Sequence, residues 1–477
     1  IIPIPKGHKG SLSSSDNYRG ICLSSIICKI IDLVVLQRYL DKLSTSELQF
    51  GFKAGRSTNM STMLVKEAIT YYTSNSSSVF CTLLDAKSAF DRVNYSKLFN
   101  LLNDRKIPPL IVRFLLNMYT CHKTRVSWNG SLSDFFPVKN GVKQGGILSP
   151  ILFCVYLDSL LVKLCKCGKG CFIGNLCLAV TAYADDIVLL APTASAMRHL
   201  LSVCDDFAAE YDILFNASKS KCIYFAPCNI IIRSGTKIPR PVFYIGGKAI
   251  DYVKSWPHLG HVLNENNDDS DDIINRRNIL IGQINNVLCY FGKLDATVKC
   301  KLLYSYCSGF YGCELWRLKS PQLQSVGATW RRALKRIWQL PYNTHCDILN
   351  AICGKWSIDD EICRRQIRFF KTCLSSNCAP VSTVIKFGLC NGPARSVICS
   401  NALYCCQKYN INIHDLTDDD FIKSISNFFL LCGKPAVSGD IVNSLLEIVF
   451  IRDGVFNLNS FLNWQQLQDI IIELCTM

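Results

Sequence analysis

The spacing of apolar residues switches between a strand-like and a helical pattern along the chain. The run "VFCTLL" at 79–84 is short, apolar and partly β-branched, which predicts a buried strand. Before it, "TNMSTMLVKEAITYY" follows a helical period, with Thr58 or Asn59 as its cap. Later, "FIGNLCLAVTAYADDIVLLAP" predicts two strands whose turn is the "YADD" itself, and "SAMRHLLSVCDDFAAEYDI" predicts the helix that follows.

Between these strands the pattern predicts further helices and one hairpin. "NYSKLFNLLNDRKI" and "PPLIVRFLLNMYTCH" have helical spacing, and Asn94 would cap the first. "KTRVSWNGSLSDFFPVKNGV" predicts a hairpin with its turn at Asn129-Gly130. "SPILFCVYLDSLLVKLC" predicts a helix with Ser149 as N-cap and Pro150 as first residue. The order of elements describes an α+β fold, a sheet backed by helices.

From about residue 270 the helical period dominates. We expect a boundary near the acidic loop "NENNDDSDD" at 264–272 and a softer one near 350. A chain of 477 residues is too long for one core, so several subdomains are expected. No stretch reaches the ~18 uncharged apolar residues that span a membrane, and no signal peptide is visible. The first residue is Ile, so we expect a fragment that lacks an upstream segment.

The chain contains 27 cysteines, scattered through apolar segments. This usage is typical of free, buried thiols in a reducing compartment and not of a secreted disulfide scaffold. The dense cluster "CKCGKGCFIGNLC" at 165–177 lacks zinc-site spacing, and its glycines favour a turn that leads into a hairpin.

The formal net charge is +15, and basic residues cluster in "NRRN", "WRRALKR" and "CRRQIRFFK". A polyanion such as nucleic acid is the natural partner, because each phosphate contact releases counterions. The alternative is a basic protein without such a partner.

Adjacent Asp185 and Asp186 interrupt an otherwise apolar stretch, although a buried carboxylate is costly unless a cation neutralises it. Asp85 ends the predicted strand at 79–84, and if the two strands are neighbours, all three carboxylates converge at one sheet edge. Hard oxygen ligands suit Mg²⁺, and two such ions can activate an attacking 3′-oxygen and stabilise a leaving phosphate. The alternative is a solvated Asp-Asp turn.

Four ordered segments, "LLDAKSAFDRV", "GVKQGGILSPILF", "YADDIVLL" and "FNASKSKCIYF", resemble motifs A to D of a reverse transcriptase, and more narrowly of a non-LTR (LINE-type) retrotransposon. The similarity begins at "IIPIPKGHKG", includes "ELQFGFKAGRST" and a primer-gripping "SWPHLGHVL", and weakens towards residue 340. It implies a right-hand polymerase. Its parts would be fingers at 1–78, palm at 79–263 (with 95–140 partly fingers), a helical thumb at 264–350 and a helical C-terminal domain of unknown role at 351–477.

The resemblance also implies roles for individual residues. Asp85 and Asp185 would bind two Mg²⁺ ions, for which Mn²⁺ could substitute, with Asp186 in support and the Ala86 carbonyl as a further ligand. Lys219 would be the general acid for pyrophosphate, with Lys221 as its rival at the same strand entrance.

A second group of residues would contact the incoming nucleotide. Phe90 matches a steric gate against the 2′-hydroxyl, although an ordinary core aromatic is the alternative. Gln144 and Gly145 would approach the nucleotide or template, and Lys6 and Arg19 would pair with the triphosphate. Asp91 is similar to a family aspartate after the aromatic, although a helix-entry or salt-bridge role explains it equally well.

A third group would hold nucleic acid through phosphates and minor-groove shape. It comprises Gly260, Arg331, Arg332, Lys335 and Arg336. The alternative for the helix "ATWRRALKRIWQLP" is a solvated face with Trp330 and Trp338 in the core.

The resemblance thus implies an RNA-directed DNA polymerase that extends a DNA primer or target end on an RNA template with dNTPs, which is target-primed reverse transcription. It implies assembly in the cytoplasm and integration in the nucleus. An endonuclease that commonly precedes such a polymerase would be missing, so we expect no nicking by this chain. Two alternatives are a decayed or domesticated protein that only binds nucleic acid, and a group II maturase or telomerase-like enzyme.

Overall fold

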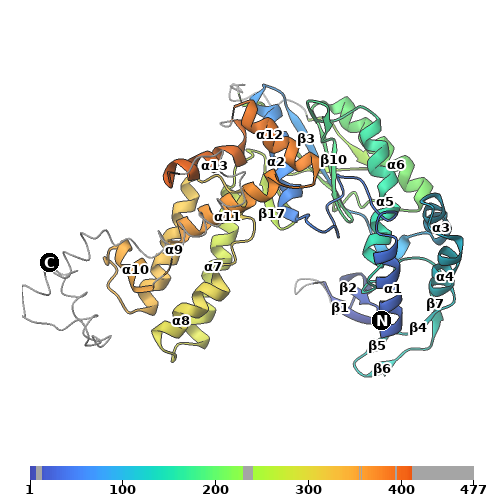
Figure 1. The fold of residues 1–477 in the computed structure, drawn as a ribbon, viewed down its shortest axis with the longest axis horizontal. Helices are drawn as coiled ribbons and strands as arrows, with labels where there is room; N and C mark the ends of the chain where they lie inside the picture. The colour runs from blue at the N-terminus through green and yellow to red at the C-terminus, as the bar shows by residue number, and fades with distance from the viewer. Residues whose placement is uncertain (7–12, 229–239, 354, 356, 393–394, 411–477) are drawn as a thin grey trace, which may run out of the picture. The chain divides into compact units, whose positions relative to one another are not determined.

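The computed structural model describes residues 1–6, 13–228, 240–353, 355, 357–392 and 395–410 (Figure 1). The chain forms two compact units. Unit 1 comprises residues 1–259, 265–267 and 376–384, and unit 2 comprises 260–264, 268–375 and 385–477. The four-part division into fingers, palm, thumb and C-terminal domain stays a prediction.

Unit 1 is built on a five-stranded sheet with the order β10-β11-β3-β12-β15. The strands are β3 (Val79–Leu84), β10 (Val180–Tyr183), β11 (Asp186–Ala191), β12 (Lys221–Phe225) and β15 (Asp251–Tyr252). All neighbours are antiparallel except β12 and β15. Every residue of central β3 is buried, which explains the continuous apolar run of its sequence. The predicted strands at "VFCTLL" and on both sides of "YADD" are therefore confirmed.

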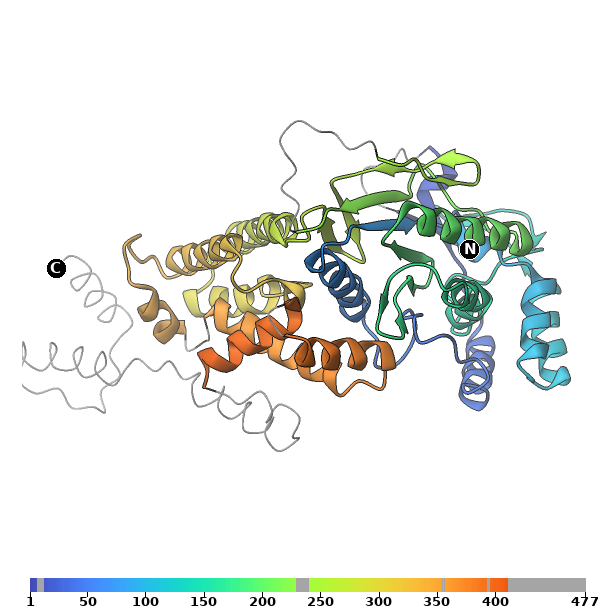
Figure 2. The same ribbon diagram turned by 90° about the horizontal axis from the view of Figure 1, so that it is seen from above.

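Three long helices pack on this sheet (Figures 1 and 2). Helix α2 (Thr58–Ser74) contacts β3 and β10, α5 (Ser149–Lys166) contacts β10, and α6 (Ala194–Tyr211) contacts β11 and α5. Most residues of α2 and α5 are buried, because both are core helices with apolar residues on several faces. The predicted α+β class with a sheet backed by helices is confirmed.

The remaining elements of unit 1 are shorter. They are β1 (Ile2–Pro5), β2 (Tyr18–Ile21), α1 (Ile26–Arg38), α3 (Tyr95–Asp104), α4 (Pro109–Thr120), β4 (Lys123–Thr124), β5 (Ser127–Trp128), β6 (Ser131–Leu132), β7 (Phe136–Pro137), β8 (Phe172–Ile173), β9 (Leu176–Cys177), β13 (Tyr244–Ile245), β14 (Lys248–Ala249) and β16 (Ser255–His258). The hairpin predicted around Asn129-Gly130 forms as β5 and β6, and the cysteine-rich segment leads into the β8–β9 hairpin.

In its described residues, unit 2 is helical apart from β17 (His261–Asn264). Its helices are α7 (Ser270–Tyr290), α8 (Ala296–Leu302), α9 (Pro321–Ile337), α10 (Cys346–Cys353), α11 (Ile358–Leu374) and α13 (Val397–Lys408), while α12 (Ala379–Cys390) is divided between the two units. Trp330 and Trp338 are only 2% and 6% exposed and belong to the core of unit 2. The alternative that treats both tryptophans as core residues is the one that the structure supports.

Several local predictions need correction. Ser149 is not the N-cap of α5, because the cap is Leu148 and the Ser149 hydroxyl lies 3.3 Å from the Tyr119 hydroxyl instead. Ser57, and neither Thr58 nor Asn59, caps α2 with its side chain. Asn94 does cap α3 as predicted, accepting a hydrogen bond from the Lys97 N–H.

The acidic loop at 264–272 is also more than a linker. Asp269 and Asp272 are 1% and 0% exposed, so these two charges are buried within unit 2. Every cysteine in the described ranges is a free thiol, as its distribution predicts. Within those same ranges no helix is long and apolar enough to cross a membrane.

Candidate active site

The "YADD" segment forms the tight turn between β10 and β11. Tyr183 pairs with Asp186 in the antiparallel ladder, which leaves Ala184 and Asp185 as the two turn residues. Ala184 has φ +56°, the left-handed conformation that two-residue hairpin turns require. Asp185 is half-buried in the turn, while Asp186 is an exposed residue at the start of β11.

The ladder between β11 and β3 brings the third carboxylate to the same place. Ile187 pairs with Leu84, so the next position of the register sets Asp186 opposite Asp85. The Asp85 N–H donates to the Ser220 hydroxyl at 3.1 Å, and its carbonyl accepts from the Asn216 N–H at 2.8 Å. The backbone of Asp85 is therefore fixed from the side of β12, and its carboxylate lies at the edge that carries Asp185 and Asp186.

Burial raises the pKa of all three carboxylates, and the charges of neighbouring carboxylates add to the effect at Asp185 and Asp186. Loss of hydration, followed by the charges of Asp185 and Asp85, raises the pKa of Asp186 to about 6. Burial and then Asp85 raise the pKa of Asp185, against its own backbone N–H and the charge of Arg19. Burial also raises the pKa of Asp85, although Lys219 and Lys6 oppose this effect. The edge is thus an anionic cluster that would be stabilised by a cation.

The structure distinguishes Lys219 from Lys221. Lys221 pairs with Leu83 in the ladder of β12 with β3, and Lys219 lies two residues before it, in the turn whose Asn216 N–H donates to the Asp85 carbonyl. Lys219 is exposed, and its charge lowers the pKa of Asp85. Lys221 instead donates to Asp251 at 2.7 Å. Of these two lysines, Lys219 is the one whose charge acts on the carboxylate cluster.

Two further cations reach the cluster from the β1–β2 hairpin. Arg19 pairs with Ile4 in this hairpin, and the Lys6 N–H donates to the Asn17 carbonyl at 2.8 Å. Both side chains belong to exposed residues. Since Arg19 lowers the pKa of Asp185 and Lys6 lowers that of Asp85, both cations act on the carboxylates from a segment remote in sequence.

The side chain of Gln49 is hydrogen-bonded to the backbone of the "YADD" turn. Its side-chain oxygen accepts two hydrogen bonds, from the Ala184 N–H and the Gly51 N–H, both at 2.9 Å. Leu48 and Phe50 exchange backbone hydrogen bonds with Ala182 on either side of this contact. Gly51 has no room for a side chain, because a Cβ atom there would lie 2.5 Å from the Ala184 nitrogen. The segment "ELQFGFKAGRST" therefore supports the turn that carries Asp185.

The glycine loop before α5 packs against the end of β2. Gly145 has φ +104°, and a Cβ atom there would lie 2.9 Å from the Cys22 carbonyl oxygen. The Cys22 N–H donates to the Gln144 carbonyl at 2.6 Å. The Gln144 side-chain amide donates to Asp91 at 3.2 Å, so the predicted nucleotide contact of Gln144 would require this amide to exchange partners.

Phe90 stacks on Phe153 of α5, with ring centroids 4.6 Å apart and planes inclined by 17°. The residue is half-buried, so α5 supports one face of the ring while part of the side chain remains accessible. The packing agrees with a core contribution, and the predicted role as a steric gate stays a prediction.

The structure supports the predicted metal site only in part. In the part of the chain that the structure describes, no three His, Cys, Asp or Glu side chains are grouped closely enough to hold a metal ion. The donor types nevertheless fit Mg²⁺, because all three side chains are carboxylates, and hard oxygen ligands suit this ion. The bridge of Ala86 with Phe215 uses the Asp85 carbonyl and the Lys87 N–H, which leaves the Ala86 carbonyl outside it.

The residues predicted to hold nucleic acid lie in unit 2. Gly260 has φ +80° and packs on Tyr311, whose ring would be 3.0 Å from a Cβ atom. On α9, Arg332 and Arg336 are exposed, while Lys335 donates to the Tyr342 carbonyl at 2.5 Å. Arg331 turns towards Asp359, at 3.9 Å. Only part of the predicted basic surface is therefore directed to solvent.

The sequence pattern does not by itself indicate a role for Gln49, Gly51 or Ser220. The quoted segment around Gln49 shows the family resemblance, but nothing in its local pattern indicates a partner 135 residues away. A buried amide between apolar residues is the one signal that could have drawn attention to Gln49, which is 0% exposed.

Comparison with known proteins places this site in context. Residues 4–263, more than half of the chain, match the model of the family described as "Reverse transcriptase (RNA-dependent DNA polymerase)". The chain is 27% identical over 247 residues to the Pol polyprotein of the type-2 retrotransposable element R2DM of Drosophila melanogaster, covering 51% of this chain and 23% of that protein. It is 24% identical over 361 residues to the RNA-directed DNA polymerase from mobile element jockey of the same organism, covering 72% and 38% respectively.

A solved structure of apo telomerase from Candida tropicalis is also similar, with 11% identity, a TM-score of 0.39 and coverage of 87% of this chain and 60% of that one. The chain spans about a quarter of the length of the first curated relatives that it matches. The matched range contains all four motif segments and the three carboxylates, and the predicted resemblance to non-LTR retrotransposon polymerases is confirmed. The chain belongs to the reverse transcriptase (RNA-dependent DNA polymerase) family.

Proposed function

We propose that this chain is an RNA-directed DNA polymerase of a LINE-type retrotransposon. The observation that carries the proposal is the convergence of Asp85, Asp185 and Asp186 at one sheet edge, where their pKa values are raised. Repulsion among the carboxylates makes such a cluster unfavourable by itself. Divalent cations that also bind the nucleotide phosphates would neutralise its charge.

Asp85 and Asp185 would hold two Mg²⁺ ions, or Mn²⁺ in their place, with Asp186 and the Ala86 carbonyl in support. When bound, the metal supplies activation of the primer 3′-oxygen and stabilisation of the leaving pyrophosphate. Gln49 contributes by fixing the turn, because its two hydrogen bonds determine where the Ala184–Asp185 backbone lies.

The chain's own cations would take part at the phosphates. Lys6 and Arg19, whose charges act on the carboxylate cluster, would pair with the triphosphate of the incoming dNTP. Lys219 would donate a proton to the pyrophosphate, a role that requires a lysine not engaged elsewhere. Lys221 is less suited, because it is bound to Asp251.

Selection of the nucleotide would depend on Phe90 and the glycine loop. Phe90 is held by Phe153, so a ring pressed against the sugar could not yield easily to a 2′-hydroxyl. Gln144 and Gly145 would approach the nucleotide or template from the loop that packs on Cys22.

The finer architecture that we propose is a right hand. Fingers and palm would correspond to unit 1, and the thumb to the helical part of unit 2. Gly260 and the exposed Arg332 and Arg336 would contact the RNA–DNA hybrid, with Arg331 and Lys335 contributing less because each has an intramolecular partner.

The test is primer extension by the purified chain on an RNA template with a DNA primer, dNTPs and Mg²⁺. The site variant is Asp185→Asn, Asp186→Asn, and the matched control is Asp41→Asn, Asp104→Asn, which removes the same charge from exposed positions of unit 1. Extension by the parent and the control but not by the site variant supports the proposal. A parent that binds the hybrid without extending it overturns the proposal and favours a protein that only binds nucleic acid.

A further inference from the structure

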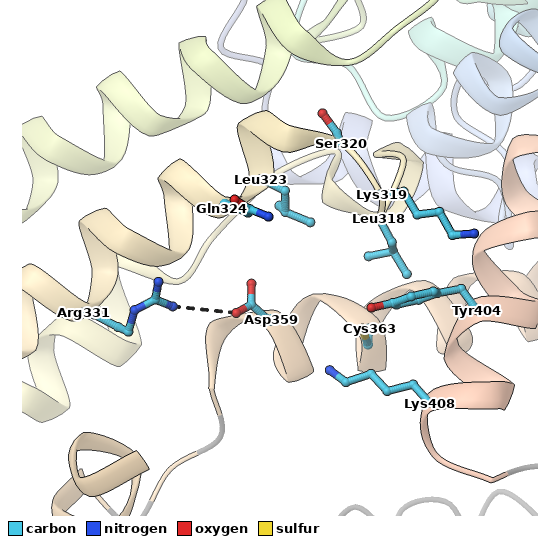
Figure 3. Close-up of a pocket in the computed structure, with 10 residues that line it drawn as sticks. All are labelled: Leu318, Lys319, Ser320, Leu323, Gln324, Arg331, Asp359, Cys363, Tyr404 and Lys408. Carbon is cyan, nitrogen blue, oxygen red and sulfur yellow. Dashed lines mark ion pairs between the residues drawn. The ribbon is translucent and has the colours of Figure 1, made fainter. Parts of the chain in front are cut away.

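Unit 2 contains a pocket of about 500 Å³ whose cations lie apart from one another (Figure 3). Arg331 and Lys319 lie at opposite ends of it, with Asp359 between them, and Lys408 donates to Asp360 at 2.7 Å. The cations at the two ends are too far apart to bind one group of a ligand. Around the carboxylate of Asp32 in unit 1, by contrast, several groups converge.

Helix α1 turns this carboxylate inwards and its isoleucines outwards. Asp32 and Val35 are the buried residues of the helix, and Asp32 is 7% exposed. Ile26, Ile27 and Ile30 are 75%, 69% and 54% exposed. Hydrophobic burial alone favours the opposite orientation, because a buried isoleucine stabilises a fold whereas a buried carboxylate loses its hydration. The orientation of α1 therefore indicates a specific interaction at Asp32.

The Asp32 carboxylate lies at the start of α5. Its Oδ2 atom accepts a hydrogen bond from the Leu148 N–H at 3.4 Å, and the Ile147 N–H is a further donor to the same carboxylate. Leu148 is the N-cap of α5, and its own side chain has no oxygen that could accept from the helix backbone. A helix N-terminus carries unpaired N–H groups and a partial positive charge, so a carboxylate supplied by another helix stabilises it.

The groups that compensate the burial of Asp32 all belong to the loop before α5. Burial raises the pKa of Asp32, and the Leu148 N–H, the charge of Lys143 and the Ile147 N–H oppose this effect. These three groups lie within residues 143–148, which connect the segment after β7 to α5. The buried carboxylate of α1 is thus matched to this one loop.

The same loop contains the residues predicted to approach the nucleotide, Gln144 and Gly145. The Cys22 N–H donates to the Gln144 carbonyl at 2.6 Å, so the chain directly after β2 holds the loop from a second side. Strand β2 also carries Arg19, one of the cations predicted to pair with the triphosphate. The loop is therefore held between the end of β2 and Asp32 of α1.

We propose that Asp32 is a positioning residue for the incoming nucleotide. By accepting from the backbone at the start of α5, it fixes the loop that presents Gln144 and Gly145, and so increases the affinity for dNTP. Asp32 acts through the loop and not on the reacting atoms. The inference rests on the proposed polymerase function, because it concerns the same nucleotide site.

The test is a titration of dNTP with the full chain on an RNA template and a DNA primer, in two forms. With an extendable primer, the rate of extension gives KM and kcat. With a primer that lacks its 3′-hydroxyl no bond can form, and the unfolding temperature of the complex as a function of dNTP concentration gives the affinity. The second form does not depend on extension.

Asp32→Leu keeps a similar volume but removes the acceptor. It should raise KM and weaken dNTP binding about tenfold, because a buried donor is left without a partner, and lower kcat by less than about threefold. Asp32→Asn keeps an acceptor oxygen and should stay within about threefold of the parent in both measurements. The matched control is Asp295→Leu, which removes a carboxylate that accepts from the Thr297 N–H at 2.7 Å at the start of α8. The control should leave dNTP binding unchanged.

The proposal is overturned if folded Asp32→Leu binds dNTP like the parent, or if Asp32→Asn or Asp295→Leu weakens binding as much as Asp32→Leu does. Asp32→Ala takes the place of Asp32→Leu if circular dichroism shows that the latter is unfolded. If neither variant folds, the proposal also fails, because Asp32 would then serve the fold and not the nucleotide. A parent that binds dNTP without extending primers would lose the polymerase function, and the comparison of variants would still decide the role of Asp32. A parent that neither extends nor binds dNTP overturns both.

Discussion

The side-chain oxygen of Gln49 accepts a 2.9 Å hydrogen bond from the Ala184 N–H, and Gln49 is completely buried. The same oxygen accepts from the Gly51 N–H, so one amide joins the turn that carries Asp185 to a segment 135 residues earlier. A buried N–H that loses its acceptor costs about 1–3 kcal/mol, which makes this hydrogen bond decisive for the position of the turn.

We therefore expect Gln49→Met, which keeps the volume but removes the acceptor, to lower kcat for extension by about 10- to 100-fold, because small displacements of reacting groups have effects of this size. The Mg²⁺ concentration for half-maximal activity should rise as well, a change that loss of stability alone would not produce. Thr181→Val is the control, since Thr181 is buried in β10 and its hydroxyl has no hydrogen-bond partner. Equal metal dependence in Gln49→Met and the parent would contradict a positioning role.

Lys219 and Lys221 allow a second paired experiment. Lys219→Gln should reduce kcat by about 100-fold or more if Lys219 is the general acid. In the parent, the Lys219 charge lowers the pKa of Asp85, so its removal should raise this pKa. The acidic limb of the pH–rate profile should therefore move to higher pH. Lys221→Gln removes the partner of an exposed Asp251 and a cation that lies 5.7 Å from the centre of the Trp256 ring, so a loss of about 1 kcal/mol in stability and little change in rate are expected. The reverse ranking of the two variants would assign the acid to Lys221.

The strands around the site could be predicted from the sequence because their information is local. Strand β3 is buried along its whole length, so its sequence is a continuous apolar run. The turn of "YADD" places polar residues between two apolar strands, and this interruption can be recognised in the sequence. The resemblance to known motifs then identified Asp85, Asp185 and Asp186. Local spacing could not rank Lys219 above Lys221, because the difference depends on Asp251, which lies 30 residues after Lys221.

Other features depend on packing partners that the local pattern does not contain. Gln49 acts on a turn far along the chain, and Arg331 of α9 lies 3.9 Å from Asp359 of α11. The predicted caps lie one or two residues from the observed cap at α2 and one residue from it at α5, because Ser57, Thr58 and Ser149 are all acceptable cap residues and tertiary contacts select among them.

The raised pKa of Asp186, about 6, predicts a pH-dependent stability that a metal removes. A carboxyl group whose pKa is raised by folding stabilises the native state while protonated, and this contribution is lost as pH rises from about 4 through about 6. In the presence of a metal chelator at pH 8, Asp186→Asn should therefore unfold at a higher temperature than the parent. The difference between the two unfolding temperatures should shrink towards pH 4. Thermal unfolding as a function of pH measures this. Added Mg²⁺ should close the gap at pH 8, and a gap that is independent of both pH and metal would contradict the carboxylate cluster.

Asp272 provides the corresponding case in unit 2, with the opposite sign. It is 0% exposed and accepts hydrogen bonds from the Trp316 indole N–H at 2.7 Å and the Val262 N–H at 3.0 Å, while the His261 Nδ1 lies 3.2 Å away. Burial alone would raise the pKa of Asp272, but His261, Trp316 and the Val262 N–H outweigh it and lower the pKa below the usual 3.8. The buried charge is therefore stabilised by its partners.

We expect Asp272→Asn to destabilise the chain by roughly 2–4 kcal/mol at pH 7, because the replacement weakens bonds to buried donors. A group whose pKa is lowered by folding contributes stability above its unfolded pKa, and this is lost as pH falls further. The difference between parent and variant in urea unfolding should thus persist from pH 7 to about 4 and shrink only below that. The neighbouring Asp271→Asn is the control, since Asp271 is exposed on the same turn of α7. If both substitutions cost the same, the buried network around His261 and Trp316 contributes nothing specific to unit 2.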